Sequence, residues 1–349
     1  MAKIPVGILG ATGLVGQRFI QLLARHPWFE VTAVAASERS AGKRFGDAAH
    51  WLLPTPIPDR VAGMTVAESR PPLDCAVVFS ALPSGVARDV EPAFAEAGYM
   101  VSSNASAYRR EPDVPLLIPE VNPDHLGLLK SQQKSRGWDH GCLVTNPNCS
   151  TITLVMVLKP LYDAFGLEQV IVTTMQAVSG AGYPGVPALD VIDNVLPHTD
   201  GEEPKLEWEP LKLLGSLNGA EIGLADLPIS AHCHRVAVWD GHTEAVSVKL
   251  GRPATVDEVQ QVLREFRGAP QELRLPSAPK LPLEVRGQDN RPQPRLDRDA
   301  AGGMATVVGR IRPCPILDWK LLVVGHNTIR GAAGAAILNA ELMKVRGYL

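Results

Sequence analysis

One cysteine, Cys149, lies in a stretch of sequence that suits nucleophilic chemistry. An apolar run, residues 142–144, leads into a polar turn, and residues 152–158 form a second apolar run directly behind the cysteine. If this second run is a helix, Cys149 lies at its N-terminus, where free backbone N–H groups and the positive end of the helix dipole favour a thiolate. A thiolate there would be a nucleophile, and the same N–H groups could hold an oxyanion.

The alternative for Cys149 is an ordinary buried thiol, since most free cysteines are inert. Its neighbours argue against this, because a structural cysteine seldom has so many polar residues around it: Asn146, Asn148, Ser150 and Thr151. Other cysteines lie in apolar contexts that fit the inert interpretation: Cys75, Cys142 and Cys314. The five cysteines are widely spaced and form no CxxC pair, which indicates neither a disulfide framework nor structural zinc.

A nucleophilic thiol needs an acid–base partner, and His242 is the best candidate. It lies at a turn that enters a strand, a place from which a side chain can project into a cleft; the alternative is a surface turn histidine. His232 and His234 would share one face of a strand, but no third or fourth ligand is evident, so we expect no metal site.

Further candidates are less specific. A predicted strand ends at Gln176 and runs into a loop of small residues that contains Ser179 and Gly180, where a substrate or a nicotinamide could approach the backbone; the alternative is an ordinary glycine-rich turn. Candidate anion clamps are Arg109, Lys212 and Arg235, although the sequence around each one, taken alone, favours a surface charge.

A glycine motif near the N-terminus predicts dinucleotide binding. Gly10, Gly13 and Gly16 follow an apolar strand, residues 4–9, and open a helix. Glycines at these positions let the backbone approach a pyrophosphate, which then sits on the helix N-terminus. The position between a buried strand and a helix favours cofactor binding over a simple tight turn.

The end of the second strand favours NADP over NAD. NAD-binding proteins usually have an acidic residue here for the ribose hydroxyls, whereas this chain offers Ser37, Arg39 and Ser40, with Lys43 nearby, which suit a 2′-phosphate. Glu38 is the exception, and we expect it to point away; the alternative is a solvated, mildly basic loop.

Strands that alternate with helices predict a parallel sheet covered on both faces, a Rossmann-type α/β domain. The expected strands are residues 4–9, 29–36, 76–79, 100–102 and 142–144, and the expected helices begin near residues 17, 86 and 152. After Cys149 the pattern changes, with expected strands at 170–178, 236–239 and 243–250 and a polar segment at 267–298. These features predict a second, α+β domain with a mostly antiparallel sheet.

The expected domains are therefore an NADP-binding domain, residues 1–148, and a second, catalytic domain, residues 149–326. The Ala-rich helix expected at 331–345 should return to the first domain, so residues 327–349 complete it. The 349 residues and 45% hydrophobic content fit two packed domains. A net charge of −3 gives no sign of nucleic-acid binding, and the absence of a signal-peptide or spanning segment favours a cytoplasmic protein.

At these residues the chain closely resembles the aspartate-β-semialdehyde dehydrogenases, in the branch typical of archaea and fungi. The matching blocks run in the expected order over nearly the whole chain: Gly10 to Gly16, Ser103 to Ala105, Ile118 to Asn122, Asn146 to Thr151, Gln176 to Gly185, Asp240 to Glu244 and His326 to Gly334. N-acetylglutamyl-phosphate reductases share the architecture but typically carry Pro-Gly-Cys at the cysteine.

The resemblance implies a role for each site residue. Cys149 would be the nucleophile, His242 the acid–base, and Gln176 would orient the intermediate. Arg235 would bind the substrate α-carboxylate and Glu209 its amine. Phosphate would be held by Arg109, Asn148 and Lys212. The cofactor would contact Gly10, Thr12, Gly13, Leu14, Val15, Ser37, Arg39, Ser40, Ser80, Ala81, Leu82, Pro83, Asn104, Ser179, Gly180 and Asn327.

The chain departs from the family pattern near Arg235. His234 replaces a usual asparagine and Ala237 a usual proline, so the family pattern does not define the pocket wall at these two positions. Arg110 also stands where a methionine is common, so Arg109 and Arg110 could exchange roles.

The expected reaction is the NADPH-dependent conversion of L-aspartyl-β-phosphate to L-aspartate-β-semialdehyde through a Cys149 thioacyl intermediate. This reaction feeds lysine, threonine and methionine synthesis. The resemblance implies a homodimer or homotetramer with the catalytic-domain sheet as its interface, so residues 149–326 would be a catalytic and dimerisation domain. We expect no nucleic-acid or membrane partner. Two alternatives remain at this stage: a malonyl-CoA reductase of the same branch, and a non-catalytic NADP-binding sensor.

Overall fold

The first sheet of the protein is parallel and lies at the N-terminal end of the chain. The computed structural model describes residues 2–349. In spatial order the strands are β3 (Ala67–Glu68), β2 (Phe29–Ala36), β1 (Ile4–Leu9), β4 (Val77–Ser80), β5 (Met100–Ser103) and β6 (Cys142–Thr145). Every neighbouring pair is parallel, so all the carboxyl ends meet at one edge, and the strand order reverses beside β1, where open α/β sheets bind ligands.

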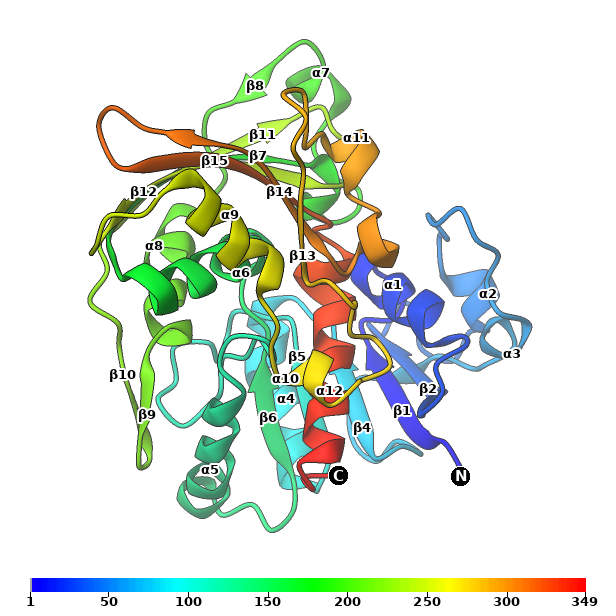
Figure 1. Cartoon of the computed structure of the whole chain (residues 1–349). Helices are drawn as coiled ribbons and strands as arrows, with labels where there is room; N and C mark the ends of the chain where they lie inside the picture. Colours follow the sequence, from blue (N-terminus) through cyan, green and yellow to red (C-terminus); the bar gives the residue numbers. More distant parts are fainter. Residues whose placement is uncertain (1) are drawn as a thin grey trace.

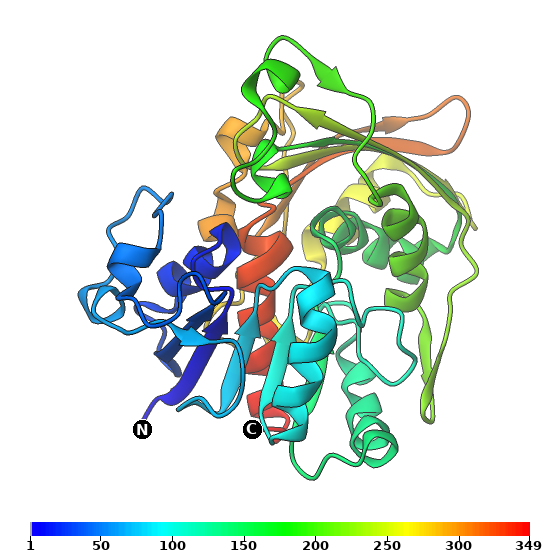
Figure 2. The same cartoon turned by 180° about the vertical axis from the view of Figure 1, so that it is seen from behind.

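Helices cover both faces of this sheet, which explains why its strands read as continuous apolar runs. The helix α4 (Ser84–Glu96) lies on one face, and α1 (Leu14–Leu23) and α12 (Gly334–Val345) lie on the other (Figures 1 and 2). A single π-helical turn, η4 (Ile329–Ala333), leads into α12. The remaining helices of this part are short or peripheral: α2 (Phe45–Ala48), α3 (Asp59–Ala62), η1 (Pro123–Gly127) and α5 (Leu128–Arg136).

The second sheet is mixed and mostly antiparallel. Its strands, in spatial order, are β13 (Leu283–Val285), β14 (Thr306–Pro313), β15 (Trp319–Gly325), β12 (His242–Leu250), β7 (Leu167–Gln176), β11 (Ile229–Val236) and β8 (Val195–Leu196). The parallel pairs are β13 with β14 and β7 with β11. Helices α6 (Cys149–Phe165), α8 (Glu203–Leu213) and α9 (Val256–Glu265) lie on one side of it (Figure 1).

Shorter elements complete the second part: η2 (Val178–Ala181), α7 (Ala188–Val191), the hairpin of β9 (Ser216–Asn218) and β10 (Glu221–Gly223), α10 (Ala269–Glu272), α11 (Pro294–Asp297) and η3 (Ala300–Gly303). Among the helices described in residues 2–349, none is both long and apolar enough to cross a membrane.

The predicted Rossmann-type domain and the α+β part are confirmed. The C-terminal helix α12 packs against β5 of the first sheet. The strand predicted at 236–239 is wrong. The strand there is β11 (Ile229–Val236), and residues 237–241 form a bend that ends at Gly241, whose φ is 97°. The inward side chains of β11 include Ala231, Cys233 and Arg235, so no strongly apolar alternation marks the strand.

The strands β14 and β15 carry no counterpart in the sequence prediction. All strands of the first sheet lie within residues 4–145, and all strands of the second large sheet lie within residues 167–325. The boundary residues 148/149 and 326/327 stay predictions.

The helix α6 connects the two sheets. Residues 150–158 are buried on all sides of the helix, as expected for a helix that is apolar all round. Its body packs against β7, β12 and β15 of the second sheet, while its first turn follows directly from β6 of the first. Cys149 is therefore held where the two layers meet.

A buried ion pair fixes the returning C-terminal segment. The Arg330 guanidinium donates two hydrogen bonds to the Glu120 carboxylate, at 2.9 and 2.7 Å, and both side chains are fully buried. The pair ties η4 to the loop before η1. A bidentate pair of this kind is sensitive to the loss of one partner, because the other charge is then left buried.

We expect Glu120→Gln to lower the free energy of unfolding by about 3–5 kcal/mol, since the Arg330 charge would lose its counter-ion in a buried site. Urea unfolding followed by circular dichroism measures this. The matched control is Asp163→Asn, which removes a surface pair with Lys159 and should change stability by about 0.5 kcal/mol or less. Similar effects of the two substitutions would contradict the prediction.

Candidate active site

Cys149 is the first residue of α6, and Asn148 caps the helix. The Asn148 Oδ1 accepts hydrogen bonds from the backbone N–H groups of Ser150 (2.9 Å) and Thr151 (3.3 Å). The cap uses these two N–H groups, so in this conformation they are not free to hold an oxyanion, and the oxyanion role of the helix N-terminus stays a prediction. The turn η4 closes the other side: a Cβ on Gly331 would come within 2.7 Å of the Cys149 Cβ.

His242, the first residue of β12, contacts the nucleophile. Its Nε2 lies 3.2 Å from the Cys149 Sγ, while its Nδ1 accepts a hydrogen bond from the backbone N–H of Ala177 at 3.0 Å. Because an N–H group faces Nδ1, the proton of a neutral imidazole must be on Nε2. His242 therefore donates a hydrogen bond toward the sulfur.

Burial controls the protonation of both groups. Burial and, to a smaller extent, the charge of Glu202 raise the pKa of Cys149 to about 12, while Arg235, Arg109 and the N–H of Ser150 act in the opposite direction. Burial, with the charge of Arg235 and His326, lowers the pKa of His242 to about 3. The free protein therefore holds a thiol beside a neutral imidazole, whereas the helix N-terminus alone had predicted a thiolate.

Two neighbouring strands end beside this pair. Gln176, at the end of β7, donates from Nε2 to the Ser150 hydroxyl at 3.2 Å. Arg235, from β11, donates to the Ala177 carbonyl at 2.8 Å. A Cβ on Gly180 would lie 2.8 Å from the Arg235 Nη1 and 3.1 Å from the His242 Cε1, so only glycine fits there without displacing these groups.

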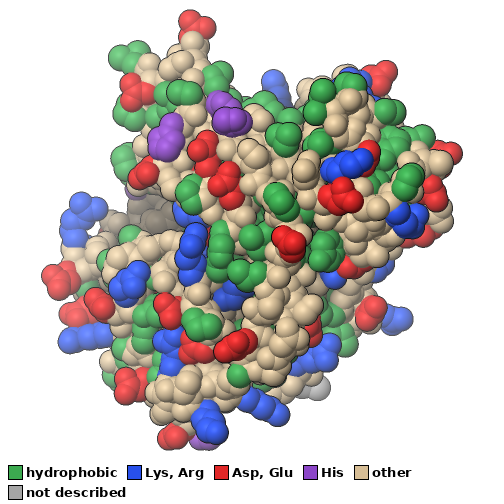
Figure 3. All heavy atoms as spheres, turned by 90° about the vertical axis from the view of Figure 1, so that its left-hand side faces the viewer, with side chains coloured by type: hydrophobic (Ala, Val, Ile, Leu, Met, Phe, Trp, Pro, Cys, Tyr) green, Lys and Arg blue, Asp and Glu red, His purple; other side chains and the backbone are tan. Residues whose placement is uncertain are grey.

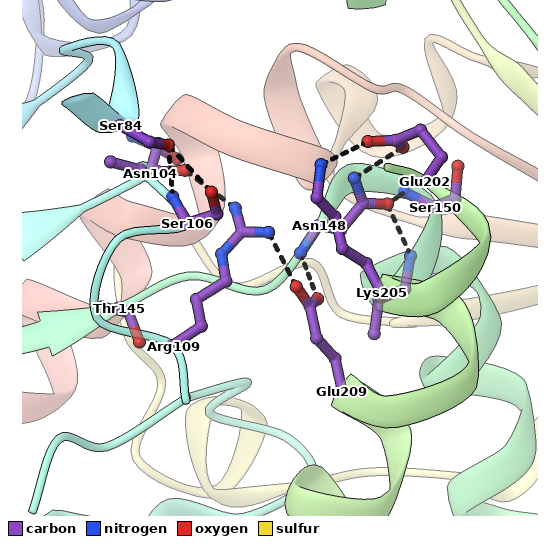
Figure 4. Close-up of polar contacts among 12 residues, drawn as sticks. Ser84, Asn104, Ser106, Arg109, Thr145, Asn148, Ser150, Glu202, Lys205 and Glu209 are labelled. Atoms are coloured by element: carbon purple, nitrogen blue, oxygen red, sulfur yellow. Dashed lines mark hydrogen bonds and ion pairs between the residues drawn. The ribbon is translucent and has the colours of Figure 1, made fainter. Parts of the chain in front are cut away.

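A second group of polar residues joins α8 to the cap (Figure 4). The Glu209 carboxylate accepts from the Arg109 guanidinium at 2.8 Å and from the Asn148 backbone N–H at 2.6 Å. Arg109 also donates to the Asn104 carbonyl at 2.8 Å. Arg110 instead lies over the Trp208 ring, 4.7 Å from its centroid, so Arg109 is the arginine that reaches the site.

Lys212 is buried at the edge of this group. Its ammonium donates to the carbonyls of Arg109, Glu111 and Val114 at 2.8–3.0 Å. Burial lowers the pKa of Lys212 to about 8, opposed by Asp113 and Glu111. All three donors of the ammonium are used in this conformation, so phosphate binding by Lys212 requires the exchange of at least one of these bonds.

The sequence reasoning missed Glu202, the residue directly before α8. Its carboxylate accepts from the Asn148 side-chain amide (2.7 Å), the Gln176 amide (3.3 Å) and the Lys205 ammonium (2.8 Å). No local motif marks this position. The only signal in the sequence is that Glu202 lies seven positions before Glu209, which is two turns away along the same helix.

A cavity of about 740 Å³ runs from the glycine motif to Cys149. Among the predicted cofactor residues it is lined by Gly10, Thr12, Gly13, Leu14, Val15, Ser37, Ala81, Leu82, Pro83, Asn104, Ser179, Gly180 and Asn327. Ser80, Arg39 and Ser40 do not belong to this lining. The wall at the end of β2 is formed instead by Glu38, Glu68, Ser69 and Arg70, so the expectation that Glu38 points away is wrong.

Asn327 joins the turn before His242 to the loop that contains Ser179. Its side-chain Oδ1 accepts from the backbone N–H of Gly241, next to His242, and its Nδ2 donates to the Ser179 hydroxyl, both at 2.8 Å.

The two histidines considered as metal ligands, His232 and His234, have ring centroids 6.3 Å apart on β11. Within residues 2–349 no group of three potential ligands gathers to hold a metal ion.

Comparisons with known proteins agree with this architecture. The model of the semialdehyde dehydrogenase NAD-binding domain matches residues 5–129, and that of the semialdehyde dehydrogenase dimerisation domain matches residues 158–330. The aspartate-semialdehyde dehydrogenase of Archaeoglobus fulgidus is 57% identical over 342 residues, which cover 98% of each chain. The Candida albicans protein of the same name is 48% identical over 365 residues, covering 100% of each.

Solved structures give the same result. The aspartate-semialdehyde dehydrogenase of Candida albicans, solved with NADP, has a TM-score of 0.92 at 46% identity and covers 100% of both chains. That of Vibrio cholerae, complexed with ASA, has a TM-score of 0.76 at 28% identity, again over 100% of both chains. From the full-length matches and the Cys149–His242 geometry, we conclude that this chain belongs to the aspartate-semialdehyde dehydrogenase family.

Proposed function

We propose that the protein catalyses the NADPH-dependent conversion of L-aspartyl-β-phosphate to L-aspartate-β-semialdehyde and phosphate. The observation that carries this proposal is the contact between Cys149 and His242 at the end of a dinucleotide-sized cavity. The named relatives support the same reaction, and they support neither the malonyl-CoA reductase alternative nor the non-catalytic sensor.

The cavity fits a dinucleotide by its own geometry. The N-terminus of α1 begins at Gly13 without a side-chain cap, so its N–H groups are available to a pyrophosphate. Gly10 has a φ of 73°, and a Cβ there would lie 2.6 Å from the Ala81 carbonyl oxygen, so only glycine allows this turn. When bound, NADPH supplies the hydride that reduces the acyl group.

The chain's own residues would carry the covalent steps. The Cys149 sulfur forms a bond to the acyl carbon as the bond from that carbon to the phosphate oxygen breaks, and the thiol proton leaves with the phosphate. His242 relays this transfer through Nε2: it donates its Nε2 proton to the departing phosphate oxygen and takes up the thiol proton at the same atom, because Nδ1 is held by the N–H of Ala177. After the acyl carbon has been reduced, the carbon–sulfur bond breaks to release the aldehyde, and the sulfur takes a proton from solvent through Nε2 of His242.

Charged residues around the sulfur suit a small substrate with several charges. Arg235 is placed for the α-carboxylate, to which a guanidinium can bind in a bidentate manner. Glu209 is assigned to the amine, and Arg109, Asn148 and Lys212 to the phosphate. Arg109 and Glu209 are paired at 2.8 Å in the free protein, so substrate binding would replace this pair with two pairs to the substrate.

The direct test follows NADP⁺ reduction with L-aspartate-β-semialdehyde and phosphate. We expect phosphate-dependent activity that falls by at least about 10³-fold in Cys149→Ala, because the covalent step would be lost. The control Cys314→Ala, at a turn between β14 and β15, should keep native activity. If the native protein is inactive here but oxidises NADPH with malonyl-CoA, the acyl-phosphate proposal is wrong.

We propose further that Arg70 binds the 2′-phosphate of NADP, together with Ser37. Arg70 lines the cavity beside the end of β2, and its guanidinium pairs with Glu68 at 2.8 Å while remaining exposed. Arg39 and Ser40, assigned to the 2′-phosphate from the sequence, remain candidates that would need a movement of their loop to reach it.

Arg70→Ala should raise the KM for NADP⁺ by about tenfold and leave the KM for NAD⁺ nearly unchanged, because a charge-assisted bond worth about 1.5–3 kcal/mol is lost only with the phosphorylated cofactor. Steady-state kinetics with both cofactors measures this. Arg39→Ala, run in parallel, reports whether the loop contributes. Arg60→Ala, an exposed arginine on α3, is the control; an equal effect of Arg60→Ala and Arg70→Ala would contradict the assignment.

We infer a homo-oligomer that forms through the face around α7 and β8, in the cytoplasm. Side chains on this face leave much apolar area exposed: Tyr183 (61%), Leu189 (94%), Ile192 (63%), Val195 (55%) and Trp239 (61%). β8 is also an edge strand, which another chain can extend.

The surface charge gives no indication of nucleic-acid binding. On the face drawn in Figure 3, acidic and basic side chains are interspersed, so this face offers no basic surface for a nucleic acid.

Leu189→Asp combined with Ile192→Asp should reduce the mass in solution toward that of a single chain, because a charge would have to be buried at the interface. Light scattering after size-exclusion chromatography measures the mass. The control is Ile316→Asp, which changes a side chain 83% exposed at the β14–β15 turn and should leave the mass unchanged. A native protein that already runs as a single chain would refute the inference.

A further inference from the structure

Glu202 lies near Cys149 and contacts three elements of the site. It is buried, and its Oε2 accepts from the Asn148 Nδ2 on the α6 cap and from the Gln176 Nε2 at the end of β7, at 2.7 and 3.3 Å. Its Oε1 accepts from Lys205, one turn along α8. Figure 4 shows Asn148 between Glu202 and Glu209.

A carboxylate can only accept hydrogen bonds, so Glu202 determines which way two side-chain amides point. The NH₂ group of Asn148 must face Glu202, which leaves Oδ1 for the N–H groups of Ser150 and Thr151. The NH₂ group of Gln176 is shared between Glu202 and the Ser150 hydroxyl. The Gln176 carbonyl is thus left for a partner in the site.

Glu202 also brings a negative charge near the sulfur. The charged and titratable groups that face it come from every surrounding element: Lys205 on α8, Arg235 and Cys233 on β11, and Cys149 on α6. The sulfur in turn faces Arg109, Arg235 and His242. Because the site is buried, the charge of Glu202 is weakly screened and opposes a second negative charge on Cys149.

We propose that Glu202 is a positioning residue with two effects: its carboxylate fixes the amide orientations of Asn148 and Gln176, and its charge adds to the burial that disfavours a thiolate at Cys149. The proposal extends the proposed function, in which Cys149 is the nucleophile, but its first test needs no substrate. Lys205 opposes the charge of Glu202 and should therefore influence the sulfur with the opposite sign.

The test measures how fast iodoacetamide alkylates Cys149 between about pH 6 and pH 10, by peptide mass spectrometry, with Cys149→Ala as the blank. In the native protein the rate should rise with pH over the whole range, because the pKa of the thiol is raised to about 12. Glu202→Gln should react about three- to fourfold faster at each pH, since the loss of one like charge lowers the thiol pKa by about one unit, which gives about tenfold more thiolate but a weaker nucleophile.

Lys205→Met should react more slowly than the native protein, because the charge of Glu202 is then less compensated. This opposite sign separates an effect of charge from a loss of structure, which would move both variants in the same direction. Glu202→Asp keeps the charge and shortens the side chain, so its alkylation should stay close to native. Glu265→Gln, which removes an exposed carboxylate on α9, is the control and should match the native protein.

Turnover tests the positioning effect. Glu202→Gln and Glu202→Asp should both lower kcat by about tenfold or more while the KM for NADP⁺ stays native, because the amides that face the reacting group are released and the cofactor cavity is not changed. Native alkylation by Glu202→Gln, or shifts of the same sign for Glu202→Gln and Lys205→Met, would overturn the charge effect. A native kcat in both Glu202 variants would overturn the positioning effect. Inactivity of the native protein would count against the proposed reaction alone.

Discussion

The cap that Asn148 places on α6 fixes Cys149 relative to both sheets. The Asn148 side chain binds the first turn of α6, while its backbone N–H and its amide are held by Glu209 and Glu202 from α8. A helix N-terminus normally offers free N–H groups, but here two of them are used to hold the nucleophile in place. The cost is that stabilisation of an oxyanion must come from other donors, among which Nε2–H of His242 is already directed at the reacting sulfur.

The other half of the site depends on contacts that join the two sheets. Asn327 holds the turn before His242 and the hydroxyl of Ser179, and Arg18 on α1 pairs with Asp240 at 3.0 Å in the same turn. The cofactor wall and the acid–base group are therefore parts of one hydrogen-bonded network.

The sequence predicted those features that depend on local pattern. The glycine motif, the strand before Cys149 and the helix behind it follow from periodicity and turn chemistry, and every strand of the first sheet except the two-residue edge strand β3 was predicted. β11 was misplaced because its inward residues, such as Cys233 and Arg235, are not strongly apolar, and Glu202 was missed because its partners lie 26 and 54 positions away. The position of Arg70 beside the end of β2 depends likewise on the pairing of β2 with β3, which no local pattern reveals.

The raised pKa of Cys149 is compatible with catalysis through a thioester. Fewer molecules carry a thiolate at neutral pH, but each thiolate is a stronger nucleophile, since nucleophilicity rises with thiol pKa. A thioester is neutral, so the burial that disfavours the thiolate favours the acylated protein relative to it. Binding of an anionic substrate would not lower the thiol pKa by charge; it would instead separate Arg109 from Glu209 and place the acyl carbon beside the sulfur. The site is therefore arranged so that reactivity depends on the position of the substrate more than on a standing thiolate.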